Sequence, residues 1–425
     1  MNKIDARNIL RGDFYKERSA YIAAGEPGIF HCHHYNCYLQ AVLLDTKDYL
    51  PNIEQVLVDS AQEVAYSQFQ AFFQNTPDLD IQGRKHTVTD YFRFAGFGQI
   101  DLDRVDNKGG TVTTNSEHYG VSWKLKFGKS NQPISFFTTG FLAGATEAIY
   151  GLALGTLNAV QESCLAMGDK YSQFTLSISN SDRELTASPQ EGVFQTGNLP
   201  QPTNTSIDYE AIREALIHMP IEGAANGLID SFGVLLTRHY ANYYCNISYR
   251  FLNLFMKSMG TEGLNIATSL LIEGGRVCAF NTFGGVMQSN EWNALIKPMI
   301  KTREDWIHGI IVVVNALGWG IWQVEDLDPG KRILVKIQSG YESNAYLKKF
   351  GPSSLPISFL AAGGVAGLMN LVYALNLPER APITLDEAVY KKISLGNDYF
   401  VPTQIKCRAM GAEFDLIEAA LVRNG

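Results

Sequence analysis

The 425-residue chain lacks any cluster of basic residues. Lys and Arg together number 35 against 43 Asp and Glu, so the formal net charge is −8. A nucleic-acid surface needs clustered Lys and Arg to neutralise phosphates. We therefore expect no nucleic-acid partner.

The chain is also poor in cysteine and in secretory features. Its six cysteines, at positions 32, 37, 164, 245, 278 and 407, form no regular framework of the kind that marks disulfide-rich secreted domains. The start, Met1 to Asp5, has no apolar core of a signal peptide. Both absences predict a reducing, cytoplasmic location.

The chain lacks one motif typical of nucleotide-binding proteins and one typical of hydrolases. There is no Gly-x-x-x-x-Gly-Lys-Ser/Thr loop for phosphates and no Gly-x-Ser-x-Gly elbow for a nucleophilic serine.

Two stretches have almost no charge: Phe136 to Val160 contains only Glu147, and Leu355 to Leu377 contains none. Their length would permit a membrane span, but neither has a flanking basic cluster or aromatic belt. We expect no span, and a helix buried on all sides in each stretch instead.

What the chain does have is a long internal repeat. Gln132 to Tyr150 reappears as Leu355 to Tyr373 with eight of nineteen positions identical, including both members of a Gly-x-x-x-Gly pair. The repeated glycines, Gly140/Gly144 and Gly363/Gly367, predict close approach of another backbone to each helix. The match extends to Phe127-Gly128 with Phe350-Gly351 and to Cys164–Gly168 with Cys407–Gly411.

A repeat of this length predicts two copies of a whole domain rather than a solenoid. We expect a first domain over residues 1–180, a polar linker over 181–206 and a second domain over 207–425, with the two copies packed as a pseudo-dimer. Within the first copy the patterns predict, in order, a short helix over 4–25, two amphipathic helices over 39–73, an antiparallel meander over 94–127, the buried helix after Pro133 and a hairpin over 164–178. The expected fold class is α+β, with an antiparallel sheet packed with helices in each copy.

A family resemblance follows from three motifs of the second copy. Lys349-Phe350-Gly351-Pro352, Pro356-Ile357-Ser358-Phe359 and Cys407-Arg408-Ala409-Met410-Gly411 together resemble the 4-vinyl reductase domain, here tandemly duplicated. The resemblance implies the fold of TRAPP subunits and of the aromatic-sensing half of phenol- and xylene-responsive activators. No DNA-binding or ATPase module follows either copy. Only the capacity to enclose a small aromatic or apolar ligand is therefore carried over.

In the sensor branch the resemblance also implies a structural zinc site. The corresponding positions are Ser135, Gln161, Cys164 and Ser172 in the first copy, and Ser358, Gln404, Cys407 and Asp415 in the second. One thiolate in four does not make the complete tetrahedral set that structural zinc needs. The family zinc is predicted to be absent, and Cys164 and Cys407 are expected to be buried as small hydrophobic residues.

The most unusual local sequence is His31-Cys32-His33-His34-Tyr35-Asn36-Cys37-Tyr38. On an extended segment His31 and His33 would point to the same side; on a helix His31 and His34 would share a face. With Glu117 and His118, two of these imidazoles would form a two-His, one-carboxylate set suited to Fe(II) or Zn. The simpler interpretation is that the histidines satisfy backbone groups, since the second copy keeps only His239-Tyr240, paired with His34-Tyr35.

Two functions therefore stay open. The first is binding of a small aromatic or apolar molecule in a buried pocket of the first copy, the second copy being a structural partner. The alternative is a metal-dependent enzyme, with His31, His33, His118 and Glu117 as ligands. The predicted ligand-binding residues are His31, His33, His34, Tyr35, Tyr38, Glu117, His118 and Tyr119. If the chain has a protein partner, we expect it to be a second copy of the chain, in a homodimer.

Overall fold

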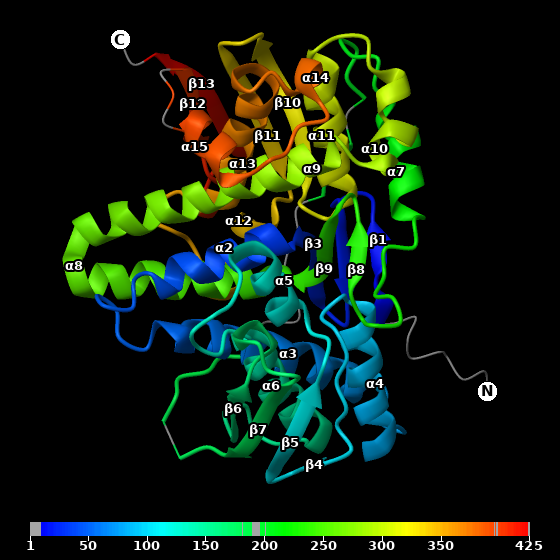
Figure 1. Ribbon diagram of the computed structural model, residues 1–425, viewed down its shortest axis with the longest axis vertical. Coiled ribbons are helices and arrows are strands. Elements are labelled where there is room, and N and C mark those ends of the chain that lie inside the picture. The colour runs from blue at the N-terminus through cyan, green and yellow to red at the C-terminus, as the bar shows by residue number, and fades with distance from the viewer. Residues whose placement is uncertain are drawn as a thin grey trace.

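The computed structural model describes residues 10–180, 182–188, 196–199, 201–394, 396 and 398–423. The two halves of the sequence lie at opposite ends of the molecule, with a shared sheet between them (Figure 1). Helices pack on antiparallel sheets throughout. The predicted α+β fold class is confirmed.

The first half supplies the following elements. Its strands are β1 (Asp13–Tyr15), β2 (Ala20–Ala23), β3 (Glu26–Cys32), β4 (Val105–Asp106), β5 (Gly109–Thr114), β6 (Leu157–Ser163) and β7 (Ser172–Ile178). Its helices are α2 (His33–Leu44), α3 (Ile53–Asn75), α4 (Ile81–Phe94), α5 (His118–Phe127) and α6 (Phe136–Tyr150), with a 3-10 turn η1 (Leu165–Met167).

The second half supplies a longer set. Its strands are β8 (Ile229–Ser231), β9 (Val234–Tyr240), β10 (Ile321–Asp328), β11 (Arg332–Gln338), β12 (Asp398–Lys406) and β13 (Asp415–Arg423). Its helices are α7 (Tyr209–Ile217), α8 (Ala241–Cys278), α9 (Gly284–Val286), α10 (Asn290–Leu295), α11 (Glu304–Ala316), α12 (Tyr341–Phe350), α13 (Phe359–Met369), α14 (Leu377–Arg380) and α15 (Glu387–Ser394). Short turns η2 (Ala279–Phe283), η3 (Lys297–Met299), η4 (Asn370–Ala374) and η5 (Arg408–Met410) complete it.

Each half has its own four-stranded sheet. The strand orders are β4-β5-β7-β6 and β10-β11-β13-β12, so corresponding strands follow one another in the same way along the chain. The third sheet is five-stranded, β1-β2-β3-β9-β8, and takes strands from both halves through the antiparallel β3–β9 pair. This pair brings residues about 200 positions apart into contact. Descent of the halves from one copied unit stays a prediction.

The repeated glycines allow close helix packing. A Cβ atom at Gly140 would lie 2.0 Å from the carbonyl oxygen of Val58 in α3, and one at Gly363 would lie 2.0 Å from that of Ile272 in α8. Helices α6 and α13 are almost wholly buried. The predicted close approach is confirmed. Among the described residues, no helix combines the length and the apolar character needed to cross a membrane.

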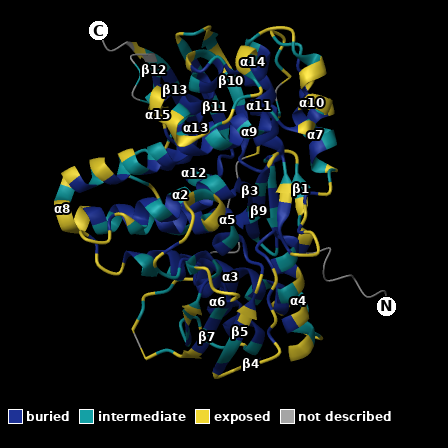
Figure 2. Cartoon of the chain, in the orientation of Figure 1, coloured by how far each residue is buried: buried dark blue, intermediate teal, exposed yellow. Residues whose placement is uncertain are grey.

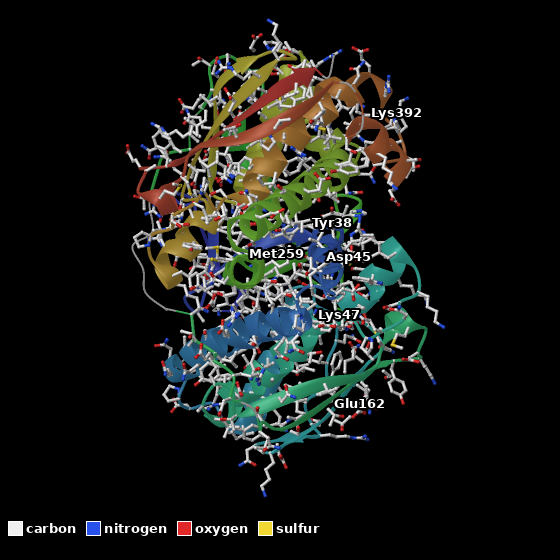
Figure 3. The ribbon with its side chains drawn as sticks, turned by 90° about the vertical axis from the view of Figure 1, so that its left-hand side faces the viewer. Tyr38, Asp45, Lys47, Glu162, Met259 and Lys392 are labelled. Atoms are coloured by element: carbon white, nitrogen blue, oxygen red, sulfur yellow. The ribbon has the colours of Figure 1, made fainter. Side chains whose placement is uncertain are left out.

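Helix α8 runs outward from the molecule and returns (Figure 1). The reversal occurs at Gly260, whose φ of 63° and ψ of −145° are not helical. The first arm follows β9 as α2 follows β3, and the second arm packs against α13 as α3 packs against α6. Side chains at this turn are exposed (Figure 2), and Met259, 43% exposed, is labelled there in Figure 3.

Two sequence-based assignments are wrong. In the predicted helix over 4–25, Leu10 and Arg11 are helical, but strands β1 and β2 follow them; residues 4–9 lie outside the described residues. In the predicted meander over 94–127 the middle segment forms strand β5, but the first segment is the end of α4 and a loop with one isolated bridge at Gly98, and the last segment is helix α5. Glu117 starts this helix by accepting hydrogen bonds from the backbone N–H groups of Tyr119 and Gly120.

Where it is described, the expected linker packs against the first half at residues 182–188 and against the second half at residues 205–206, where the hydroxyls of Thr205 and Ser206 donate to Asp305. Arg183 forms an ion pair with Asp59 at 2.9 Å and donates to the carbonyl oxygen of Leu157. The backbone N–H of Ser188 donates to the hydroxyl of Ser67. Residues 181, 189–195 and 200 of this stretch lie outside the described residues.

Candidate functional site

Polar side chains collect beside the β3–β9 pair, where α2 and α8 begin. His31 is the second-last residue of β3, and His239 is the second-last residue of β9. Both are fully buried, at 1% and 0% exposure. The sequence repeat pairs His34 with His239. In the structure, however, His31 and His239 occupy the same position in their strands relative to the helix that follows, so His31 is the counterpart of His239. We call His31, His118 and His239 the imidazole cluster.

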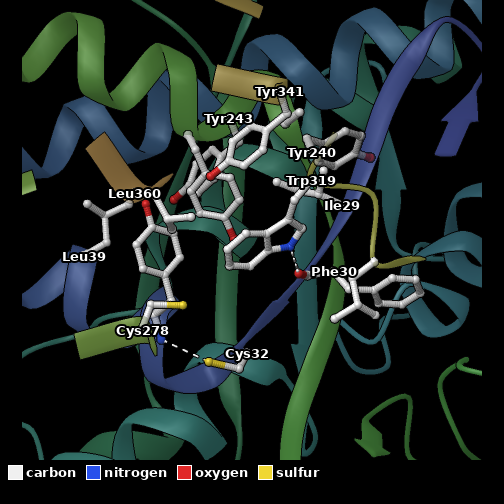
Figure 4. Close-up of a cluster of buried hydrophobic side chains, with 14 of the residues drawn as sticks. Ile29, Phe30, Cys32, Leu39, Tyr240, Tyr243, Cys278, Trp319, Tyr341 and Leu360 are labelled. Carbon is white, nitrogen blue, oxygen red and sulfur yellow. Dashed lines mark hydrogen bonds between the residues drawn. The ribbon is translucent and has the colours of Figure 1, made fainter. Parts of the chain in front are cut away.

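His31 lies in an aromatic cage. Its ring centroid is 4.7 Å from those of Tyr35 and Tyr244 and 4.8 Å from that of Trp319. Its Nε2 atom is 3.3 Å from the hydroxyl of Tyr341. Figure 4 shows Trp319 and Tyr341 in this region, with the Trp319 indole N–H donating to the carbonyl oxygen of Phe30 at 2.9 Å. Burial lowers the pKa of His31 to about 3, so the ring is neutral at neutral pH.

His118 opens helix α5 and is also fully buried. Its Nε2 atom is 3.0 Å from the side-chain nitrogen of Asn36, which also donates to Thr237 Oγ1 at 3.1 Å. The amide oxygen of Asn36 accepts from the hydroxyl of Tyr244 at 2.5 Å. The Tyr244 hydroxyl fixes the orientation of the Asn36 amide, so the amide nitrogen of Asn36 faces His118 as a donor. His118 Nε2 is therefore the acceptor of this hydrogen bond.

The neutral imidazole of His118 then carries its proton on Nδ1. Burial lowers the pKa of this group to about 3, with the neighbouring His33 as a smaller cause, which keeps the ring neutral. His118 Nδ1 has no hydrogen-bond partner within the described part of the chain, and neither has His31 Nδ1. An unpaired buried polar atom costs about 1–3 kcal/mol. Two of them in one cluster are therefore a specific feature that needs a cause.

His239, by contrast, uses both ring nitrogens. Its Nδ1 atom accepts from the backbone N–H of Tyr240 at 3.0 Å, so Nε2 carries the proton and donates to the hydroxyl oxygen of Tyr119, also at 3.0 Å. Its ring centroid lies 4.4 Å from that of Phe137. His31 and His239 thus each pack against aromatic residues of the opposite half.

His33 and His34 lie at the start of α2, with ring centroids 3.9 Å apart. His33 Nδ1 accepts from the backbone N–H of Leu235 at 3.2 Å. His34 Nδ1 lies 3.4 Å from Nζ of Lys126. Burial is the largest cause that lowers their pKa values, to about 4 and about 2. Tyr38 is only half-buried and is labelled near Asp45 in Figure 3.

Glu117 does not join the imidazoles as a metal ligand would. Its carboxylate accepts from the N–H of Gly120 at 2.7 Å and from Ser135 Oγ at 2.6 Å. Burial raises its pKa to about 7, although these donors act in the opposite direction. Across the described residues, no three His, Cys, Asp or Glu side chains are grouped to hold a metal ion. The six cysteines are free and buried.

A small cavity borders the imidazole cluster. It measures about 10 Å³ and is lined by Tyr35, Tyr244, Cys245, Ser248, Leu252, Glu342, Tyr346, Ile357 and Phe359. Tyr35 and Tyr244 form its boundary with His31. This space holds at most one water molecule. Apart from Tyr35, its lining comes from the second half, whereas the sequence placed the pocket in the first.

Larger hollows lie on the surface. One of about 640 Å³ is lined by polar residues that include Asp90, Arg93 and Lys170. Another of about 530 Å³ lies beside Glu63, whose carboxylate pairs with Arg250 and Lys349. Neither includes a residue of the imidazole cluster.

Sequence reasoning found part of this site and missed the rest. It named His31, Tyr35, His118 and Tyr119, which the structure brings to the β3–β9 region. It considered Trp319 and Tyr341 for an aromatic pocket of the second half, with a plain core role as the alternative, and it missed His239 and Tyr244. The repeated pairs Gly96-Phe97-Gly98 and Gly318-Trp319-Gly320 were a signal, because Phe97 packs against His239 as Trp319 packs against His31.

Comparisons with known proteins give little. No family model matches the chain, and no curated protein matches it. Among solved structures, the phenol-responsive sensory domain of the transcription activator PoxR, determined with phenol, is similar over 41% of this chain and 73% of that chain. The sequence identity is 12% and the TM-score 0.28. The resemblance to the 4-vinyl reductase domain is therefore not confirmed.

Proposed function

We propose that the protein binds a small, uncharged aromatic molecule at the imidazole cluster. The observation that carries this is the buried Nδ1–H of His118, a hydrogen-bond donor without a partner among the described residues. His31 Nδ1 lies unpaired nearby in the same network. A ligand oxygen that pairs with one of them removes a cost of about 1–3 kcal/mol.

The chemistry of the surroundings selects the ligand class. Trp319, Tyr35 and Tyr244 offer ring faces and edges for an aromatic ligand, which gain from offset or edge-to-face contact. The imidazoles are neutral, so a carboxylate would enter without a compensating charge from the cluster. A phenol-like compound, with one hydroxyl on an apolar ring, fits best. The resemblance of the sequence to the 4-vinyl reductase domain supports the same class.

Binding requires the cavity beside His31 to grow. At about 10 Å³ it is far smaller than a typical ligand site. Rotation of the Tyr35 or Tyr244 ring, which form the wall toward His31, would join the cavity to the imidazole cluster. The site is then a cryptic pocket that the ligand stabilises.

The metal-dependent alternative gains no support from the described geometry. His33 and His31 lie on either side of the β3–α2 junction, and Glu117 is committed to helix α5 and Ser135.

The test compares phenol with toluene, which has the same ring and no hydroxyl. Phenol should raise the melting temperature more than toluene, by about 2 °C or more at millimolar concentration. In His118→Gln the difference between the two compounds should disappear. His86→Gln, which alters an exposed histidine on α4, should keep it. Equal responses to phenol in wild type and His118→Gln, or none in wild type, would contradict the proposal.

A further inference from the structure

The positions at which the family resemblance implies zinc come together in both halves. In each half the N-terminus of one helix (α5 or α12) meets the N-terminus of the next (α6 or α13) and the start of a strand (β7 or β13). The positions are Ser135, Gln161, Cys164 and Ser172 in the first half and Ser358, Gln404, Cys407 and Asp415 in the second.

The residues present do not fit zinc. A structural zinc ion needs four ligands from Cys, His or carboxylate side chains, and each set has a single thiol. The other groups already satisfy one another. The Gln161 amide accepts from the N–H of Ser135 and donates to its hydroxyl, and the Ser172 hydroxyl accepts from the N–H of Leu165.

In the first half a carboxylate occupies the centre of this set. Glu117 Oε1 accepts from Ser135 Oγ at 2.6 Å and from the N–H of Gly120 at 2.7 Å, and lies 3.5 Å from Ser172 Oγ. Glu117, Ser135 and Ser172 are all fully buried. The carboxylate thereby joins the starts of α5, α6 and β7.

In the second half the carboxylate at the centre of this set comes from a different position. A second carboxylate, Glu342 of α12, lies beside the set and accepts from the backbone N–H groups of Leu360 and Ala361 at the start of α13. Asp415 Oδ1 accepts from Ser343 Oγ at 2.7 Å and from the N–H of Arg408 at 2.8 Å. Ser343 Oγ in turn lies 3.1 Å from Ser358 Oγ and 3.8 Å from Cys407 Sγ. Asp415 thus joins α12, α13 and β13 as Glu117 joins their counterparts.

The two halves have different residues at three corresponding positions around this carboxylate. The residue before helix α5 is Glu117, and the residue before α12 is Gly340. The first residue of β7 is Ser172, and that of β13 is Asp415. The third residue of α5 is Gly120, where a Cβ would lie 2.2 Å from Glu117 Oε1, whereas the third residue of α12 is Ser343. The half with a carboxylate before its helix has a glycine at the third helical position, and the half with a glycine before its helix has a serine there.

We propose that a buried carboxylate at the centre of this set closes each half in place of a metal, and that it can be supplied from either of two positions, before the helix or at the strand start. We call this arrangement the carboxylate clasp. Without this carboxylate several buried donors would be left unpaired. The proposal is independent of the ligand proposed above.

The experiment transplants the second-half clasp into the first half of the full chain. Glu117→Gly should lower the melting temperature by about 5–10 °C, because several buried donors lose their acceptor. Ser172→Asp alone should also lower the melting temperature, because the new carboxylate would lie directly beside that of Glu117 in a buried site. The triple variant Glu117→Gly, Gly120→Ser, Ser172→Asp should recover more than half of the loss seen in Glu117→Gly. Ser177→Asp, on the exposed side of the same strand, is the matched control and should change little.

The reverse exchange covers the case in which a first-half variant does not fold. Asp415→Ser should be destabilising, and Gly340→Glu, Ser343→Gly, Asp415→Ser should restore stability. Elemental analysis of the wild type should find substoichiometric zinc, and EDTA should leave its melting temperature unchanged. Transplants no more stable than the variants that lack a carboxylate, or a zinc ion whose removal lowers the melting temperature, would overturn the proposal.

Discussion

His31 and Tyr341 lie 3.3 Å apart, Nε2 to hydroxyl, although 310 positions separate them in the chain. The contact is matched by Tyr119 and His239 at 3.0 Å, with the roles of the halves reversed. Each half thus supplies an imidazole to the aromatic interior of the other. The imidazole cluster therefore exists only when both halves are assembled through the β3–β9 pair.

Two adjacent glycines of α13 should respond oppositely to alanine. A Cβ at Gly363 would lie 2.0 Å from a backbone oxygen of α8, so Gly363→Ala should force the helices apart. The free energy of unfolding should fall by about 3 kcal/mol or more, the upper end of the usual cost of overpacking a core. A Cβ at Gly364 meets nothing closer than 3.8 Å. Gly364→Ala should therefore be neutral or stabilise by up to about 1 kcal/mol through helix propensity. Urea unfolding of the pair measures both; equal losses would contradict the close approach.

Glu26 should make the protein less stable as pH rises through neutrality. Its side chain is 1% exposed, and burial raises its pKa to about 7, against the opposing hydrogen bond from Asn242 and the charge of Lys348. Between about pH 4.5 and 7 the folded state keeps a proton that the unfolded state has released, so the free energy of unfolding falls as pH rises through this window.

Glu26→Gln removes this titration while keeping a side-chain oxygen for Asn242, which now donates to Glu26 Oε2 at 2.6 Å. The variant should gain stability relative to wild type as pH rises from 5 to 8. Urea unfolding at both pH values gives the comparison. A difference that stays constant between them would show that the carboxyl is not held protonated.

The buried imidazoles should have the opposite pH dependence. Burial lowers the pKa of His31 and His118 to about 3, below the ordinary value of 6.5. The unfolded state therefore takes up protons that the folded state does not, and the free energy of unfolding falls as pH drops from about 6.5 toward 3. His118→Gln should lose stability less steeply than wild type between pH 6.5 and 5. An unchanged slope would mean that His118 titrates normally when folded.

The sequence was informative where one helix or strand determines its own pattern. The charge-free repeat predicted the buried helices, and its glycines predicted their close contacts. Helix α5 was predicted as a strand because Val121, Trp123, Leu125 and Phe127 alternate with polar residues. Two of them prove to be exposed, Leu125 at 66% and Phe127 at 44%. The capping carboxylate of Glu117, which starts the helix, was not recognised in the sequence.

The site was harder to predict because it is made between the halves. The cluster at residues 31–38 drew attention to His31 and Tyr35, but nothing local shows that Trp319, Tyr341 and Tyr244 surround them. The register of the repeat was also ambiguous. With three histidines within four residues, His239 could be paired with His31 or His34, and only strand β9 and the helix after it decide in favour of His31.

The most direct test of the central claim is the ring nitrogen signal of His118 in the full chain, followed by ¹⁵N NMR during a titration with phenol and assigned by its loss in His118→Gln. We predict an Nδ1–H tautomer in the free protein, and a saturable shift of this proton and nitrogen when phenol binds, with toluene shifting neither. An Nε2–H tautomer, or an Nδ1 signal that phenol leaves unchanged while it binds elsewhere, would contradict the account.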